Sequence, residues 1–142
     1  MYGTVIIDDE HNCVEVLEIL LKQNFNDIDV IGTFTSSKQA LTFLQQNAVD
    51  LVFLYIQMPF LTGIDLLEKL DKYHFHVVFT TAFDQYAIKA IKLSALDYLL
   101  KPIRVQDVVQ AVQKASQRLH MEQEYALLQL LLQSRRETAA PK

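Results

Sequence analysis

The sequence predicts a three-layer α/β domain of the flavodoxin-like (βα)5 type, with a five-stranded parallel sheet between two layers of helices and an extended C-terminal helix. Five short runs rich in β-branched and apolar residues recur along the chain. Between most of them lie segments with apolar residues at helical spacing, the alternation that indicates repeated strand–helix–strand units. Because such crossovers are right-handed, the helices are expected on both faces of the sheet.

The first half of the chain holds three of the expected strands. Residues 4–7 form a β-branched run, residues 28–34 a second run interrupted by Gly32, and residues 51–55 a run that is apolar throughout. An unbroken apolar run of this length is typical of a strand buried on both faces. Ser36 and Ser37 are candidates to cap the second helix. Three amphipathic helices are indicated by Val14, Leu17, Leu20 and Leu21, by Ala40, Leu41 and Leu44, and by Ile64, Leu66, Leu67 and Leu70.

The second half supplies two more strands, at residues 77–80 and 97–100. Between them Asp84 is expected to cap a helix that carries Ala87, Ile88 and Ile91 at helical spacing. Lys101 and Pro102 close the fifth strand. A long helix is predicted from Val105 to well beyond Leu119, because no glycine or proline interrupts the chain before Pro141.

The end of the chain differs in composition from the rest. Residues 1–119 are predicted to form one domain, and residues 120–142 a helical extension or linker toward an output domain that would follow. Residues 127–132 are almost wholly apolar. Such a patch must cover its own domain, a second copy of the chain, or a following domain.

Size and charge limit the class of protein. The 142 residues, 51% of them hydrophobic, suit one globular domain. The net charge of −4 gives no electrostatic reason to bind nucleic acid or acidic membranes. Cys13 is the single cysteine, so no internal disulfide forms. No apolar run approaches the ~20 residues of a membrane span, and a soluble, cytoplasmic protein is expected.

Polar and charged side chains end four of the predicted strands. Asp8 and Asp9 follow the first strand, Tyr55 ends the third, Thr81 follows the fourth and Lys101 the fifth. In an open parallel sheet these ends meet at one crevice. Adjacent carboxylates suit Mg²⁺, and a lysine and a hydroxyl suit a phosphoryl oxygen. Taken singly, these residues read as a solvated cap, a strand-end hydroxyl and a surface charge; together they favour a site.

Four motifs carry a resemblance to a known family. The segments VIIDDE (5–10), LVFLYIQMPFLTG (51–63), FTTA (79–82) and DYLLKPI (97–103) resemble those of the receiver domains of bacterial two-component response regulators, in the same order and spacing. The resemblance extends from residue 5 to about residue 119. Residues 81–103 are especially similar to receivers that precede a LytTR-type DNA-binding domain.

The resemblance implies a role for each matching position. In the family, an aspartate at the end of the third strand accepts a phosphoryl group from a sensor histidine kinase, and two acids hold Mg²⁺ beside it. The positions that match are Tyr55 for the acceptor, Asp8 and Asp9 for the acids, the backbone carbonyl of Gln57 for a further metal ligand, Thr81 and Tyr98 for the switch residues, and Lys101 for the phosphate contact. The Lys101–Pro102 bond is expected to be cis, as in similar proteins.

Tyr55 departs from the family pattern. A phenol, with a pKa of about 10, is un-ionised at neutral pH, whereas aspartate is a carboxylate. Losing one of three carboxylates also weakens Mg²⁺ binding. The tyrosine hydroxyl is expected to hydrogen-bond Lys101 or an acid. The sequence therefore predicts a non-enzymatic receiver that acts through protein contacts, with its usual phosphorylation lost or impaired. Strand packing and a laboratory substitution of an original aspartate are alternative readings of Tyr55.

Other functions and partners stay open at this point. Asp8 or Asp9 could serve as a substitute phosphoryl acceptor. An unrelated flavodoxin-like enzyme or flavin carrier is disfavoured, because the acidic residues 8–11 do not form the phosphate cradle that a nucleotide cofactor needs. A homodimer is expected through residues 84–119 and the C-terminal helix. DNA binding is expected only from a missing domain after Lys142, and no membrane partner is expected.

Overall fold

The computed structural model describes residues 1–83, 90 and 92–138. The expected helix behind Asp84, with Ala87, Ile88 and Ile91, lies outside the described residues. The elements, in chain order, are β1 (Tyr2–Ile7), α1 (His11–Asn24), β2 (Ile28–Phe34), α2 (Ser37–Gln46), β3 (Leu51–Tyr55), α3 (Gly63–Lys69), β4 (His76–Thr81), β5 (Asp97–Leu100) and α5 (Val105–Thr138). All five predicted strands are present.

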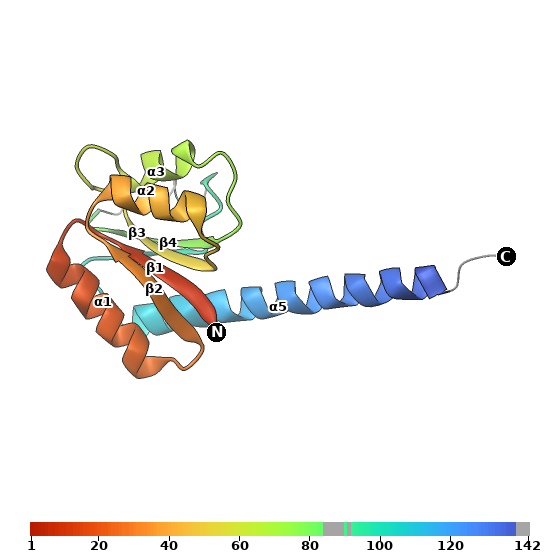
Figure 1. The fold of residues 1–142 in the computed structure, drawn as a ribbon. Coiled ribbons are helices and arrows are strands. Elements are labelled where there is room, and N and C mark those ends of the chain that lie inside the picture. The colour runs from red at the N-terminus through yellow and green to blue at the C-terminus, as the bar shows by residue number, and fades with distance from the viewer. Residues whose placement is uncertain (84–89, 91, 139–142) are drawn as a thin grey trace.

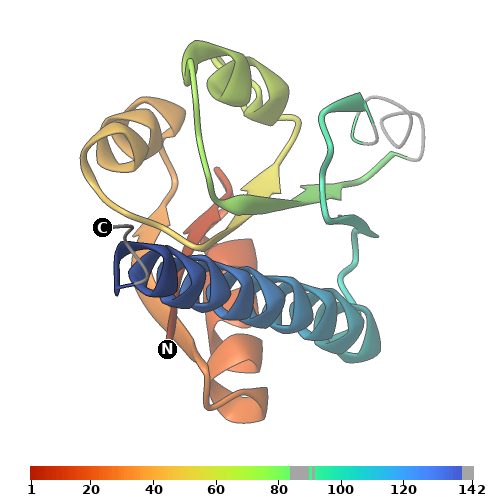
Figure 2. The same cartoon turned by 90° about the vertical axis from the view of Figure 1, so that its right-hand side faces the viewer.

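The strands form one parallel sheet in the order β2-β1-β3-β4-β5. Helices α1 and α5 cover one face of the sheet, and α2 and α3 cover the other (Figures 1 and 2). This confirms the flavodoxin-like three-layer fold. The chain runs from β1 to β2 on one side and to β3 on the other, so the strand order reverses between β1 and β3. Ligand sites of open α/β sheets lie at the carboxyl ends of strands beside such a reversal.

The central strand β3 is buried at all five of its residues. Successive side chains point to opposite faces of a strand, so Val52 and Leu54 pack into the core beside α2 and α3. Leu51 and Phe53 pack into the second core, which α1 and α5 cover. The unbroken apolar run is thus explained by two cores that share one strand.

Polar side chains fix the starts of α2 and α3. The Ser36 hydroxyl accepts a hydrogen bond from the backbone N–H of Gln39 at 3.3 Å, which confirms one of the two predicted caps. At α3 the Thr62 hydroxyl accepts the N–H of Asp65, and the Asp65 carboxylate accepts the N–H of Thr62. This reciprocal pair is a capping box, and it sets where the chain enters α3 after the turn that follows β3.

Helix α5 has 34 residues and confirms the predicted C-terminal helix. Its first half packs on the sheet, and from residue 120 to residue 136 every side chain is exposed, so Leu119 is the last buried residue within that described range. Beyond Leu119 the helix extends away from the domain (Figure 1). The division of the chain at residue 119, and a dimer contact through residues 84–119, stay predictions. Among the described residues, no helix combines the length and apolar character that a membrane crossing requires.

Candidate functional site

The carboxyl ends of β1, β3 and β5 bring three of the predicted side chains into contact. Lys101 Nζ lies 2.8 Å from Asp8 Oδ2, and it also lies over the ring of Tyr55, 3.6 Å from the ring centroid. All three side chains are largely buried, whereas Asp9 is exposed. The crevice therefore holds a lysine between a carboxylate and an aromatic face.

Lys101 contacts the ring face of Tyr55 at this site. The expected hydrogen bond from the Tyr55 hydroxyl to Lys101 or an acid is not among the contacts of the described residues. The contact between Lys101 and Asp8 is an ion pair, and the Nζ of Lys101 is buried. Ammonium groups are attracted to the negative face of an aromatic ring. The contact with the Tyr55 ring therefore offsets part of the free-energy cost of removing the Lys101 ammonium from water.

Burial governs the proton equilibria in the crevice. It raises the pKa of the Asp8 carboxyl, and the Lys101 ammonium and the N–H of Glu10 only partly offset that effect. Burial lowers the pKa of Lys101, but the contact with Asp8 outweighs it, and the net direction is upward. Burial also raises the pKa of the Tyr55 phenol. Because that pKa rises from about 10, the phenol is protonated at neutral pH.

Thr81, at the end of β4, is held by the side chain of Gln57. The Gln57 amide Nε2 donates a hydrogen bond of 2.6 Å to Thr81 Oγ1, which also accepts the N–H of Phe83 at 3.1 Å. Gln57 Oε1 is buried without a hydrogen-bond partner. The sequence assigned only the backbone carbonyl of Gln57 to the site. Its side-chain contact was missed, because it depends on the path of the turn after β3.

Tyr98 lies on β5, where its position pairs with Phe79 of β4. Its side chain is half-buried and packs against the core beside α2 and α3. The peptide bond between Lys101 and Pro102 is cis. Tyr98 therefore stands two strands away from Tyr55, with β4 between them, and its role as a switch residue stays a prediction.

The residues of the crevice fit a Mg²⁺ ion poorly. Mg²⁺ takes oxygen ligands and depends on carboxylate charge. No group of three His, Cys, Asp or Glu side chains able to hold a metal ion occurs in the described ranges 1–83, 90 and 92–138. Asp8 is already paired with Lys101, and the Tyr55 phenol is neutral. The donor set lacks the third carboxylate that would balance a divalent cation here.

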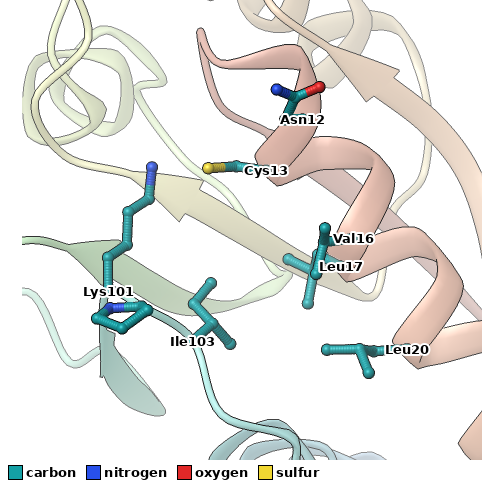
Figure 3. A pocket seen from close by; sticks show the side chains of 8 residues that line it. Asn12, Cys13, Val16, Leu17, Leu20, Lys101 and Ile103 are labelled. Atoms are coloured by element: carbon teal, nitrogen blue, oxygen red, sulfur yellow. The ribbon is translucent and has the colours of Figure 1, made fainter.

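A pocket of about 470 Å³ adjoins the site between α1 and the segment after β5 (Figure 3). Its walls are mainly apolar, formed by residues such as Val16, Leu20 and Ile103. Cys13 points toward Lys101 at one end. The Cys13 side chain is half-buried. Burial raises the pKa of its thiol, which disfavours a reactive thiolate.

A flavodoxin-like sheet with acids, a threonine and a lysine at its strand ends is the arrangement expected of a signalling receiver domain. Comparison with known families agrees, since residues 4–113 match the model described as "Response regulator receiver domain". The chain belongs to this family and is a receiver domain of a two-component response regulator.

Curated relatives carry regulatory names. The chain is 40% identical over 129 residues to an "Uncharacterized response regulatory protein" of Vibrio cholerae. The aligned residues make up 90% of the chain and 54% of that protein. It is 43% identical over 104 residues to the "Transcriptional regulatory protein BtsR" of Salmonella typhi, covering 72% of the chain and 43% of BtsR. The chain thus spans about half the length of the curated relatives it matches.

Solved structures support the same family. The response regulatory domain of protein mrkE from Klebsiella pneumoniae superposes with a TM-score of 0.77 at 30% identity, covering 84% of this chain and 98% of that one. The REC domain of AraT, a response regulator from Geobacillus stearothermophilus, gives a TM-score of 0.79 at 28% identity, covering 86% and 98%. The part of the chain outside these matches is therefore small.

Proposed function

We propose that this receiver domain signals in a two-component phosphorelay through protein contacts, with the usual aspartate phosphorylation lost or impaired. The observation that carries the proposal is the arrangement of Tyr55, Lys101 and Asp8. Tyr55 is the last residue of β3, the place where the family's motif has its acceptor aspartate. The side chain there is a neutral phenol whose ring faces Lys101.

Two features of the crevice oppose phosphoryl transfer to Tyr55. A protonated phenol is a weak nucleophile, and no base is in hydrogen-bond contact with its hydroxyl among the described residues. Lys101, which would stabilise the charge of a transferred phosphoryl group, is held by Asp8 and by the ring. Phosphoryl transfer relies on such positioned positive charge. The Tyr55 hydroxyl is therefore a poor acceptor, and the Lys101 ammonium is already engaged by other groups.

A substitute acceptor is disfavoured by the positions of the two acids. Asp8 is buried and ion-paired. Asp9 is exposed, on the loop that precedes α1. We expect neither acid to take over the reaction at the rate of an aspartate at position 55.

The same arrangement supports weak Mg²⁺ binding, through Asp8, Asp9 and the carbonyl of Gln57. Receiver domains usually bind Mg²⁺ beside the acceptor. In this chain a neutral ring replaces one carboxylate. We expect Tyr55→Asp to bind Mg²⁺ at least about tenfold more tightly than the natural sequence, because a hard cation responds to ligand charge.

The partners follow from the family and from the named relatives. Receiver domains interact with histidine kinases, and we propose a sensor kinase as an upstream contact. BtsR is named a transcriptional regulatory protein, which supports a role for this chain as the regulatory part of a LytTR-type transcription regulator. DNA contacts would then come from a domain after Lys142. The named relatives are regulatory proteins, which supports a non-enzymatic role.

The test is phosphoryl transfer to the natural chain and to Tyr55→Asp in parallel, with radiolabelled acetyl phosphate and Mg²⁺. Label is expected only on Tyr55→Asp, and it should be released by alkali, as an acyl phosphate is. Tyr55→Asp with Asp8→Asn is the control, which should label poorly because it lacks a metal-binding acid. Comparable labelling of the natural chain would overturn the proposal, whether the label resists alkali, as on tyrosine, or is released from an acid.

A further inference from the structure

A further pocket, of about 340 Å³, lies beside the start of α2. It is lined by residues 35–38, which connect β2 to the first turn of α2, and by residues 58–60 of the turn after β3. Both segments leave the sheet at its carboxyl edge, where the ligand sites of open parallel sheets lie. None of the crevice side chains Asp8, Tyr55 and Lys101 lines this pocket. It is therefore separate from the crevice, although it shares the same edge of the sheet.

The start of α2 leaves backbone donors unused. The first four N–H groups of a helix have no partner within the helix. At α2 the Ser36 hydroxyl accepts one of them, from Gln39, at 3.3 Å. The N–H groups of Ser37 and Lys38 have no acceptor among the described residues. Two backbone donors at the pocket wall are therefore available to an acceptor outside the chain.

The Ser37 hydroxyl is a third unused group, and it is a buried one. Ser37 is only 7% exposed, and it lines the pocket. Its hydroxyl forms no hydrogen bond within the part of the chain that the structure describes. Buried polar groups normally have a partner, because an unpaired one costs free energy. A ligand in the pocket supplies the partner that this hydroxyl lacks.

The charges around the pocket favour an anion. Residues 30–49 and 51–64, which include both lining segments, contain no aspartate or glutamate. The Lys38 side chain is exposed and forms no ion pair with any described carboxylate. Hydroxyls, N–H groups and an ammonium at the start of a helix are the groups that bind phosphate. The turn after β1 is acidic, whereas the turn after β2 is rich in hydroxyls and carries a lysine.

The other lining segment presents an aromatic ring. Phe60 is 97% exposed, and its neighbours Met58 and Pro59 add apolar surface to the pocket. The backbone of Phe60 has a φ of 67°, in the left-handed region that bulky residues rarely adopt. An exposed aromatic ring offers a flat face on which a nucleobase stacks, whichever base it is. The pocket thus combines a phosphate-binding end with a stacking surface.

We propose that this pocket binds a nucleoside monophosphate, with the phosphate at the start of α2 and the base on the ring of Phe60. The phosphate oxygens accept hydrogen bonds from the N–H groups of Ser37 and Lys38 and from the Ser37 hydroxyl. The Lys38 ammonium balances the negative charge. A volume of about 340 Å³ is near the lower end of the range for small-molecule sites, about 300–1,000 Å³. The pocket therefore suits one nucleotide unit rather than a dinucleotide.

This inference goes beyond the proposed function and does not rest on the state of position 55. The binding is non-covalent and uses none of the side chains in the crevice. The two ideas fail separately, because one is measured by phosphoryl labelling and the other by the binding of an unreacted nucleotide.

The test is isothermal titration calorimetry of the whole chain, without Mg²⁺, with the monophosphates of adenosine, guanosine, cytidine and uridine. At least one of them is expected to bind saturably, at one site per chain. Ribose 5-phosphate lacks the base and the free nucleoside lacks the phosphate, so each should bind at least about fivefold more weakly. In heteronuclear NMR spectra, the backbone amide signals of Ser37 and Lys38 should shift with the same saturation curve.

Three variants test the proposed contacts. Lys38→Gln removes the ammonium and Phe60→Ala removes the ring, and each should weaken binding at least about fivefold. Ser37→Ala removes the buried hydroxyl and should weaken binding about threefold or more. The same change should not lower the thermal stability of the free chain, because the hydroxyl has no partner to lose among the described residues.

The matched controls change the same residue types outside the pocket. Lys69→Gln alters an exposed lysine of α3, and Tyr125→Ala an exposed aromatic ring of α5. Both should leave the affinity within about twofold, because neither side chain lines the pocket and distant charges are screened. Thermal unfolding of every variant checks that the domain is intact.

Each contrary outcome overturns the proposal. If none of the four monophosphates binds at millimolar concentration, the pocket is not a nucleotide site. Equal binding of ribose 5-phosphate or of the nucleoside would contradict the assignment of a nucleotide. Binding that neither Lys38→Gln nor Phe60→Ala weakens, or that the controls weaken equally, would place the ligand elsewhere on the chain.

Discussion

The ring of Tyr55 occupies a position that, in a phosphoryl-accepting receiver, belongs to a carboxylate. A carboxylate there would crowd Asp8 and Asp9 with a third negative charge, and like charges at close range disfavour one another. The ring removes that repulsion and also gives Lys101 a second contact, with Nζ 3.6 Å from the ring centroid. A tyrosine at this position should therefore stabilise the fold relative to an aspartate.

The contribution of the ring can be separated from that of the hydroxyl. Tyr55→Phe keeps the aromatic face and is expected to change the free energy of unfolding by less than about 0.5 kcal/mol. Tyr55→Leu loses the cation–π contact and part of the packing, and should cost about 1–3 kcal/mol. Urea unfolding of the three proteins measures this. If Tyr55→Phe loses as much as Tyr55→Leu, the hydroxyl rather than the ring holds Lys101.

Asp8 makes the stability of the domain depend on pH. Because burial raises its pKa in the folded state, the unfolded chain releases this proton more readily. The stabilising contribution is then present below the unfolded pKa, about 3.9, and is lost as the pH rises through the folded pKa. Lys101 stays charged throughout this window, because its pKa is raised.

This dependence is tested by comparing the free energy of unfolding of the natural chain with that of Asp8→Asn at several pH values. The free energy of unfolding of the natural chain, minus that of Asp8→Asn, should fall as the pH rises from about 4 toward 7. Denaturant unfolding at pH 4, 5, 6 and 7 provides the measurement. A difference that grows with pH would mean that Lys101 lowers the pKa of Asp8 more than burial raises it.

At the scale of elements, the sequence predicts the strands better than the turns. The apolar run of residues 51–55 and the β-branched run of β1 require a doubly covered sheet, so both were predictable from pattern alone. The side chain of Gln57 was not, because its contact with Thr81 depends on how the chain leaves β3. His76 lies in β4 and pairs with Glu122 of α5. No pattern in the sequence indicated this pair, since periodicity carries no information about a partner 46 residues away.

The turn between β3 and α3 depends on a glycine for close approach. The N–H of Gly63 donates to the carbonyl of Ile56 at 2.9 Å. A Cβ on Gly63 would lie 2.5 Å from the backbone oxygen of Tyr55. This distance is far below van der Waals contact, and the oxygen belongs to the rigid end of β3. Helix α3 can approach the end of β3 this closely only because residue 63 has no side chain.

Gly63→Ala is expected to lower the free energy of unfolding by about 2–3 kcal/mol, because the clash forces the backbone of β3 or α3 to move. The matched control is Gly3→Ala, where the nearest atom to the new Cβ is the end of the flexible Ile31 side chain, 3.1 Å away. That change should stay within about 1 kcal/mol. Urea unfolding compares the two, and equal effects would show that α3 can shift away from β3 without loss.

At the scale of the whole molecule, α5 joins a packed domain to an exposed arm, residues 120–136, without a break in the helix. The sequence predicted a helix running well beyond Leu119, because no glycine or proline interrupts it. The sequence left open what the apolar residues 127–132 cover, because periodicity alone does not identify the surface against which an apolar helix face packs. The structure narrows the choice, since Leu127, Leu128 and Leu130–Leu132 are exposed and not packed into the domain's own core.

Truncation tests whether the domain ends where its burial ends. A chain that stops after Gln123 keeps Leu119 and the pair between His76 and Glu122. Measured at concentrations where the full chain is monomeric, its free energy of unfolding should match that of the full chain within about 0.5 kcal/mol, because association otherwise adds stability by mass action. A chain that stops after Ser116 removes the buried Leu119 and the pair, and should lose about 2 kcal/mol or more. Equal stability of the full and the first truncated chain, with loss only in the second, would show that the folding unit ends between residues 117 and 123, as the predicted boundary at residue 119 requires. A loss of more than about 1 kcal/mol in the first would show that the arm also stabilises its own domain.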